Sequence, residues 1–381
     1  MIPYELDEDQ KMFQETIRRM IKERLAPKAQ EVDESSEFPW DSYKLFREYG
    51  LPGINIPEEY GGVGADSLTC AIVLEEIGKT CNTSAIVLGS SFLANLVLTF
   101  AGNDEQKNRF LQKIAEGESI CAISLIEPGM PFNTDDINVA ATSAEDYYLL
   151  NGRTPVISNA DVADIIILLA RSDKVQGREG IDIFVVEKES SEYVCEKKGE
   201  LLGEGSRQAC EVVFKDCRVS GENRLAPDGG GYQKIIEILE QNSFITSARA
   251  LGLAQGAFEH ALEYAKTRVQ FGKPIIKFQG IQFIIAEMAV KIESVRQLLY
   301  KTCTEISKGS KEAIKLGAMV NSLASDAAMD VAVNSVQVFG GYGVTTEYPV
   351  SRYYRNAKLI SFVEGSKDIQ RNVIARELYA I

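Results

Sequence analysis

The middle of the chain contains the run DIIILLAR at residues 164–171, an apolar stretch held between an aspartate and an arginine. A short run of this kind predicts a strand that is buried on both faces. Further β-branched runs lie around it, at residues 119–125, 146–150, 181–186, 192–196 and 211–214. Gly, Asn, Asp and Ser separate these runs, and we interpret Asn151-Gly152 and Asn159-Ala160-Asp161 as turns. The spacing predicts a small β domain over residues 119–226.

Helical periodicity replaces this pattern on both sides of the β domain. Towards the N-terminus, apolar residues recur at three- and four-residue steps from Met12 onwards, and Asp7 with Gln10 predicts a capping box before them. Towards the C-terminus, a broad apolar stripe runs from Ile281 to Leu299, which is typical of a bundle helix. We therefore predict an α+β multidomain fold. An N-terminal α-helical domain (1–118) precedes the barrel-like or sandwich-like β domain, and a C-terminal four-helix bundle (227–381) follows it.

Composition excludes several classes of protein. The chain has 381 residues and a formal net charge of −14, so it has no electrostatic reason to bind nucleic acid. Its single histidine, His260, excludes sites with two histidine ligands, and we expect no metal site. Seven cysteines without a CxxC pair indicate reduced thiols in a cytoplasmic protein. We expect neither a targeting segment in the acidic N-terminus nor a membrane span.

Glycine motifs narrow the choice of cofactor. No GxGxxG follows a predicted strand and no GxxxxGK[ST] occurs, so a Rossmann fold and a P-loop are not supported. The cluster GGYG at residues 340–343 is, by composition alone, a turn between two helices.

The segments around that cluster occur in an order that is similar to the signature of a known protein family. The C-terminal third contains, in sequence, YAKTRVQFGKPI (264–275), FQGIQ (278–282), QVFGGYG (337–343), EYPV (347–350), RNAK (355–358) and EGSKDIQR (364–371). Together these segments closely resemble the C-terminal signature of the acyl-CoA dehydrogenase flavoprotein family. Upstream, IPEEYGG (56–62) resembles the family's N-terminal loop, and VFKDCRV (213–219) resembles the strand that closes its β domain. The resemblance therefore runs nearly end to end.

This resemblance implies a reaction and a base. Members of the family remove an α-proton and a β-hydride from an acyl thioester, with a carboxylate taking the proton and flavin N5 the hydride. Glu364 stands where most members carry the base, although a solvated glutamate at a helix start is the alternative reading. A minority place the base on an earlier helix. The matching position here is Asn242, which cannot serve, and Glu240 is a weaker substitute nearby.

The implied cofactor is FAD. By resemblance, the residues that contact FAD across a subunit interface are Arg268, Phe271, Gln337, Gly340 and Gly341. A guanidinium suits a pyrophosphate, and glycines let backbone amides approach it. By the same resemblance, the Ser158 hydroxyl stands where the family's threonine donates towards flavin N5. Ser366 and Asp368 would make the remaining cofactor contacts, near Glu364. A shared cofactor implies a homo-oligomer, a tetramer or a dimer, and electrons would leave through an electron-transfer flavoprotein.

The flavin-ring segments depart from the family pattern. In place of T-E-P-x-x-G-S-D, residues 126–133 read IEPGMPFN, and in place of W-I-T-N, residues 156–159 read VISN. A hydroxyl and a shielding tryptophan are thereby lost. We expect an altered environment for the flavin ring.

The substrate side departs as well. Glu240 is followed by Ser243, where members often carry an arginine that holds the carrier arm of the thioester. A second arginine position falls on Gly205, with Arg207 nearby as a weak candidate for substrate binding. With fewer cations, the protein makes fewer charge-assisted hydrogen bonds to the phosphates of CoA and binds them more weakly. Dehydrogenation of an acyl-CoA is the main prediction. The alternatives are an acyl group tethered to a carrier protein, an enoyl-thioester reductase and a non-catalytic binding subunit.

Overall fold

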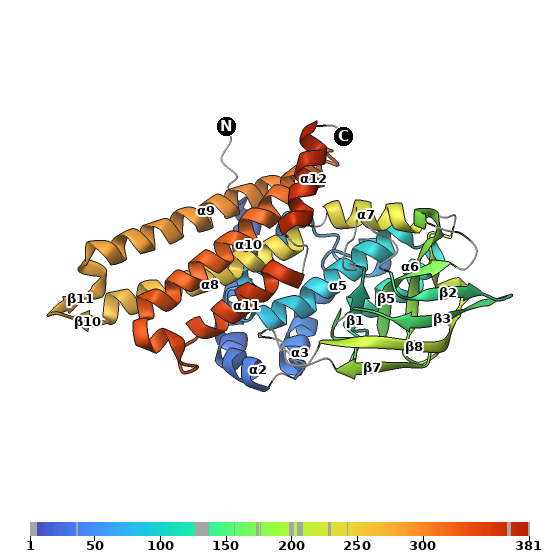
Figure 1. The fold of residues 1–381 in the computed structure, drawn as a ribbon, viewed down its shortest axis with the longest axis horizontal. Coiled ribbons are helices and arrows are strands. Elements are labelled where there is room, and N and C mark those ends of the chain that lie inside the picture. Colours follow the sequence, from blue (N-terminus) through green and yellow to red (C-terminus); the bar gives the residue numbers. More distant parts are fainter. Residues whose placement is uncertain are drawn as a thin grey trace.

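Helices, a sheet and helices again follow one another along the chain (Figure 1). The computed structural model describes residues 6–35, 37–125, 137–155, 157–172, 175, 177–197, 202–203, 209–227, 230–241, 243–363 and 367–379. This order confirms the predicted fold class.

The N-terminal block is helical. Its helices are α1 (Glu8–Met20), α2 (Ala29–Ser35), α3 (Trp40–Glu48), α4 (Ser67–Gly78), α5 (Asn82–Ala101) and α6 (Asp104–Ala115). The predicted capping box starts α1: the Gln10 amide donates to the Asp7 carboxylate at 2.8 Å, and the Asp7 amide donates to the Gln10 side chain at 3.1 Å. This reciprocal pair satisfies two amides that no helical carbonyl can reach.

Helix α5 has no charged residue, and most of its side chains are buried. Among the described helices it is the one long and apolar enough to span a membrane, and 72% of its most apolar window is buried inside the fold. It packs against β1, α7 and α8, as a mostly apolar helix does in a protein core. Helix α5 therefore joins the helical blocks to the sheet (Figure 1).

The middle block is a sheet. Its strands are β1 (Cys121–Ser124), β2 (Ala140–Ser143), β3 (Tyr147–Arg153), β4 (Ile157–Ser158), β5 (Ile165–Ser172), β6 (Ile181–Glu187), β7 (Tyr193–Lys197), β8 (Ala209–Ser220) and β9 (Arg224–Leu225). The strand order is β4-β8-β3-β2-β5-β6-β9, with β1 on β5 and β7 on β8. Strand β5 is buried on both faces, as predicted, because alternate residues such as Ile166 and Ile167 face two different apolar clusters.

One predicted turn is wrong. Asn151-Gly152 lies inside β3, where the register against β8 shifts at a β-bulge. Gly152 has a φ of +129°, and an added Cβ would lie 2.1 Å from the Asn138 carbonyl oxygen. A bulge and a hairpin turn both favour the Asn-Gly dipeptide, so the local signal cannot separate them. The predicted turn at Asn159-Ala160-Asp161 is confirmed, with Asn159 at a φ of +66°.

The C-terminal block confirms the predicted bundle. It contains α7 (Gly231–Gln241), α8 (Phe244–Thr267), β10 (Val269–Gln270), β11 (Lys273–Pro274), α9 (Gln279–Ser307), α10 (Glu312–Phe339), α11 (Val350–Val363) and α12 (Lys367–Tyr379). Helices α8, α9, α10 and α11 lie side by side and form the bundle (Figure 1). Helix α4 packs directly on α8, where a Cβ on Gly252 would lie 2.2 Å from the Glu75 carbonyl oxygen.

Candidate active site

The turn after α10 has a backbone that requires glycine. Gly340 has φ +60° and ψ −133°, a conformation that L-residues rarely adopt. An added Cβ at Gly340 or Gly341 would meet nothing within 4 Å, so both glycines border open space. Gln337, one turn earlier, is exposed on the same end of α10. The backbone of this turn is therefore free to approach a ligand.

A short hairpin carries the two other predicted contacts. Strands β10 and β11 pair antiparallel, with Gln270 opposite Lys273. Phe271 and Gly272 form the turn at φ +50° and +78°, the geometry of a two-residue hairpin turn. The Phe271 side chain is 91% exposed, and positive φ is uncommon for a phenylalanine. An exposed aromatic ring on a strained turn is typical of a contact surface.

Arg268 joins the hairpin to the glycine turn. Its guanidinium lies 5.3 Å from the centroid of the Tyr342 ring. Behind this contact, Tyr264 of α8 stacks on Phe339 of α10 at a centroid distance of 4.1 Å, and burial raises the pKa of the Tyr264 hydroxyl. The structure thus brings Arg268, Phe271, Gln337, Gly340 and Gly341 to one end of the bundle.

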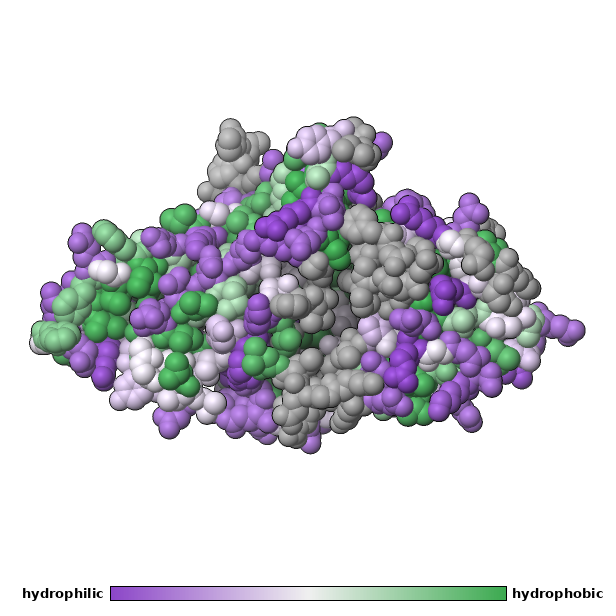
Figure 2. Space-filling model, in the orientation of Figure 1, coloured by the Kyte–Doolittle hydropathy of each residue, from purple (hydrophilic) through white to green (hydrophobic). Residues whose placement is uncertain are grey.

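Apolar surface surrounds that end. Exposed apolar side chains of the hairpin, the glycine turn and α9 are Val269, Phe271, Phe283, Val290, Tyr342 and Val344. Figure 2 shows a green patch over the hairpin end, at the left of the view. An exposed patch of this kind, rimmed by polar residues, is typical of an interaction surface.

Ser158 lies in the other half of the molecule. It belongs to β4 and pairs with Ala209 of β8. The next residue, Asn159, is fully buried, and its side-chain amide makes no hydrogen bond to any described residue. The hairpin and the sheet occupy opposite ends of the long axis (Figure 1). Helix α8 alone, with 24 residues, spans about 36 Å of that distance. The structure therefore does not bring Ser158 together with Arg268.

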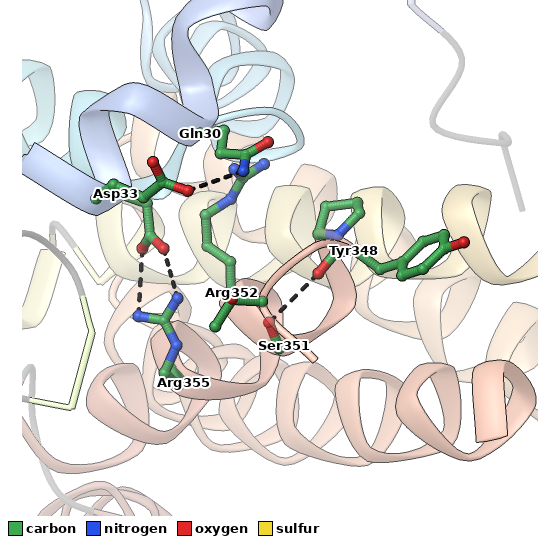
Figure 3. A pocket seen from close by; sticks show the side chains of 9 residues that line it. Gln30, Asp33, Tyr348, Ser351, Arg352 and Arg355 are labelled. Atoms are coloured by element: carbon green, nitrogen blue, oxygen red, sulfur yellow. Dashed lines mark hydrogen bonds and ion pairs between the residues drawn. The ribbon is translucent and has the colours of Figure 1, made fainter. Parts of the chain in front are cut away.

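A polar cavity of about 430 Å³ lies between α2 and α11. Figure 3 shows the Asp33 carboxylate bonded through both oxygens to the guanidinium of Arg355. Arg355 also donates to the Leu202 carbonyl oxygen at 3.4 Å. Arg355 of α11 thus connects the bundle with Asp33 of α2 and with Leu202, five residues before Arg207 in the chain.

The other predicted site residues divide into two groups. Asp368 is described: its carboxylate is 85% exposed and accepts a hydrogen bond from Arg371 at 3.0 Å. The structure does not bring it to the hairpin end. Predicted residues outside the described part are Glu364, Ser366, Arg207, Asn242 and the segment 126–133. Glu240 lies in α7, but its side chain is outside the described part as well.

Two polar side chains at the start of α8 are buried, Ser243, which the sequence singled out, and Arg249, which it did not. The Ser243 hydroxyl is buried and makes no hydrogen bond to a described residue. Arg249 is 2% exposed although it carries a charge. A signal for Arg249 exists, because it is an isolated cation within the small apolar run SARALGLA at residues 247–254.

The described residues fit FAD, the cofactor that the resemblance implies. Arg268 supplies a guanidinium for a pyrophosphate. Gly340 and Gly341 supply a backbone that no side chain covers. Phe271 supplies an exposed aromatic ring. These groups suit the phosphate half of a dinucleotide.

The family models agree with this geometry along the whole chain. The acyl-CoA dehydrogenase N-terminal domain matches residues 7–118, the middle domain 122–217 and the C-terminal domain 229–379. The chain is 35% identical over 378 residues to a short-chain-specific acyl-CoA dehydrogenase of Clostridium acetobutylicum, covering 99% of both chains.

Solved structures share the fold. A butyryl-CoA dehydrogenase of Megasphaera elsdenii superposes with a TM-score of 0.92 at 34% identity, covering 98% of this chain and 99% of that chain. The prolyl acyl carrier protein oxidase AnaB superposes with a TM-score of 0.90 at 28% identity, covering 98% of this chain and 100% of that one. The chain belongs to the acyl-CoA dehydrogenase family, and its cofactor is FAD.

Proposed function

We propose that Glu364 is the base in the FAD-dependent dehydrogenation of acyl-CoA thioesters that this enzyme catalyses. The observation that carries the proposal is the end-to-end family match, in which EGSKDIQR (364–371) follows the glycine turn in the expected order. Glu364 would take the proton from the α-carbon, and FAD would supply the acceptor for the β-hydrogen, which leaves as a hydride. Together these two transfers leave an α,β-double bond in the acyl chain.

The removal of the α-proton requires a well-placed base with a suitable pKa and stabilisation of the enolate. An α-proton of a thioester is weakly acidic, so a carboxylate must be held close and the developing enolate must meet hydrogen-bond donors. An apolar surround raises the pKa of a carboxyl towards neutrality, which suits a base at physiological pH.

A homo-oligomer, and specifically a tetramer, is the assembly that we propose. Arg268 and the glycine turn lie at one end of the chain and Ser158 in the sheet at the other. One protomer would hold the flavin ring with its sheet, and a second would hold the pyrophosphate with its hairpin and glycine turn. Such an arrangement would also cover the apolar patch around Phe271.

For the electron acceptor we propose an electron-transfer flavoprotein, and for the location the cytoplasm. All seven cysteines are free thiols, which supports a reducing compartment. The family match supports the redox partner.

A second candidate substrate is an acyl group on a carrier protein. The observation that favours it is Ser243, whose buried hydroxyl stands where members often carry an arginine. A phosphopantetheine arm lacks the adenosine phosphates of CoA and needs fewer cations. The reverse reaction, reduction of an enoyl thioester, would use the same residues.

A matched pair of substrates tests the proposal. Butyryl-CoA and the butyryl thioester of a carrier protein are each incubated with the purified holoenzyme and an electron-accepting dye, and the products are analysed by mass spectrometry. Loss of two hydrogens from butyryl-CoA supports the proposal. Loss only from the carrier-bound thioester supports the second candidate, and oxidation of neither, with FAD bound, leaves a binding subunit.

A further inference from the structure

Two cysteines of the β domain lie diagonally across neighbouring strands. Strand β7 pairs antiparallel with β8 (Figure 1), and the register sets Cys195 opposite Val212, two residues along β8 from Cys210. Because side chains alternate between the faces of a sheet, Cys195, Val212 and Cys210 lie on one face. Both cysteines pack on the same apolar cluster, in which Cys210 is buried and Cys195 is partly buried. They are thus diagonal neighbours on a single face of the sheet.

The two thiols also interact with each other. The Cys210 S–H donates a hydrogen bond to the Cys195 sulfur, and this bond lowers the pKa of the Cys195 thiol although partial burial opposes the shift. The same bond, together with burial, raises the pKa of the Cys210 thiol. The thiolate is the reactive form of cysteine, so Cys195 is the reactive sulfur of the pair and Cys210 is its protonated neighbour.

Cys195 is also the more accessible of the two. All seven cysteines lie in the described part of the chain, and Cys195 is the one that is not buried. Strand β7 pairs with β8 and with no other described strand, so it forms an edge of the sheet. A small oxidant in the solvent therefore meets Cys195 before it meets the buried thiols.

We propose that Cys195 and Cys210 are a modification site at which hydrogen peroxide forms a reversible disulfide between β7 and β8. The Cys195 thiolate attacks one oxygen of the peroxide. An S–O bond forms, the O–O bond breaks, and the other oxygen takes a proton and leaves as water. Cys210 then loses its proton and attacks the sulfur of the sulfenic acid. The S–S bond forms, the S–O bond breaks, and that oxygen leaves as a second water. One peroxide is reduced to two waters, and two thiols are oxidised to one disulfide.

Cys210 also lies next to the strand that carries Ser158. Strand β8 pairs with β4 at this point, Cys210 with Ile157 and Ala209 with Ser158. The disulfide would therefore join the edge strand β7 to the segment of β8 that pairs with Ser158. Diagonal neighbours in a twisted sheet lie near the upper limit of the Cα separation that a disulfide spans, so this bond is easily reduced. Its formation needs only the two thiols and peroxide and is independent of the function proposed above.

Peptide mapping of the wild-type holoenzyme tests the proposal. The reduced protein is treated with hydrogen peroxide, its remaining thiols are blocked with iodoacetamide, and it is digested with trypsin without a reductant. Lysines and arginines separate Cys195, Cys210 and Cys217 in the sequence, so each falls on its own peptide. We expect two of the seven free thiols to become unavailable to iodoacetamide, and the peptides of Cys195 and Cys210 to be crosslinked. Dithiothreitol should restore both thiols.

Three results on the wild-type protein would overturn the proposal. One is oxidation of Cys195 to a sulfenic or sulfinic acid with no crosslink to Cys210. Another is a crosslink from Cys195 to a different cysteine. The third is a protein in which neither thiol of the pair is oxidised.

Two variants assign the roles of the thiols. In Cys210→Ala, peroxide should leave Cys195 as a sulfenic acid that dimedone traps, because the thiol that would displace its oxygen is gone. Cys217→Ala is the matched control, since its thiol is also buried on β8 and lies outside the pair. It should lose two hydrogens from its intact mass, as the wild type does. Loss of the crosslink in Cys217→Ala would contradict the assignment. If Cys210→Ala does not fold, the wild-type peptide map still decides.

Discussion

The guanidinium of Arg268 lies over the ring of Tyr342, 5.3 Å from its centroid. This contact joins the residue that follows α8 to the turn that follows α10, and it holds a cation beside the open backbone of Gly340 and Gly341. A cation, an open glycine turn and an exposed aromatic ring converge at a surface far from the sheet. That arrangement suits a cofactor held between two copies of the chain.

Removal of the Arg268 charge should weaken FAD binding. Charge-assisted hydrogen bonds contribute about 1.5–3 kcal/mol, so Arg268→Met should raise the Kd for FAD by about 10- to 100-fold. Lys273→Met is the matched control, because this cation lies on the same hairpin and packs over Phe278 at 4.4 Å. Fluorescence titration of the apoprotein with FAD measures both constants. Equal loss in the two variants would mean that Arg268 has no specific role.

The glycine turn should tolerate alanine at one position and not at the other. Gly340→Ala forces a side chain into φ +60° and should destabilise the protein by about 1–3 kcal/mol. Gly341→Ala has the same open space without the positive φ, so its stability should change by less than about 0.5 kcal/mol. Urea unfolding of both variants checks this. An equal loss would show that the turn is not held in the glycine conformation.

The buried carboxyl of Glu76 predicts a pH dependence of stability. Burial raises its pKa and Arg18 opposes the shift, and Gln14 and Arg18 both donate to its Oε1 at 2.8 Å. A raised pKa in the folded state favours the protonated form. The stability that this group contributes is therefore complete at low pH and is lost as the pH rises through the folded pKa.

Glu76→Gln keeps the acceptor and removes the charge. At pH 7 its Tm should exceed that of the wild type by about 2 °C, and the gap should close below about pH 4, where Glu76 is protonated in both states. Differential scanning calorimetry from about pH 3 to pH 8 measures the gap. A gap that widens on acidification would contradict the sign of the shift.

The Asp33–Arg355 pair should stabilise the contact between α2 and α11. Arg355→Met leaves a mostly buried Asp33 carboxylate without its two hydrogen bonds and should cost about 1–3 kcal/mol. The control Lys28→Met breaks a nearby pair with Asp41 whose two side chains are about half exposed, and it should leave the Tm unchanged. Thermal unfolding measures the Tm of both variants. An equal loss of Tm in the two would argue against this role.

Periodicity predicted the parts of the fold that local chemistry determines. The buried strand β5, the capping box at Asp7 and the long helix from Gln279 follow from the spacing of apolar and capping residues, and the structure has all three. Asn151-Gly152 was predicted as a turn because a bulge uses the same residue types. Which of the two forms depends on the partner strand β8, which local sequence does not contain.

The site could be predicted only as separate segments. Motif order identified Arg268, Gly340 and Ser158, but only the fold shows that Arg268 contacts the turn that begins at Gly340 and that Ser158 lies at the other end. Arg249 is an isolated cation in a small apolar run, but its burial beside Gly89, more than a hundred residues earlier in the chain, is visible only in the fold. The roles of Glu364, Ser366, Asp368, Glu240 and Arg207 stay predictions.

The central claim is that Glu364 is the base of an FAD-dependent dehydrogenation, and one spectroscopic measurement tests it most directly. The visible flavin band of wild-type enzyme and of Glu364→Gln is followed during anaerobic titration with acyl-CoA thioesters, butyryl-CoA and glutaryl-CoA included. We predict that the wild-type band bleaches, and that the variant keeps its FAD and does not bleach. Bleaching of the variant at the wild-type rate would contradict the assignment of Glu364.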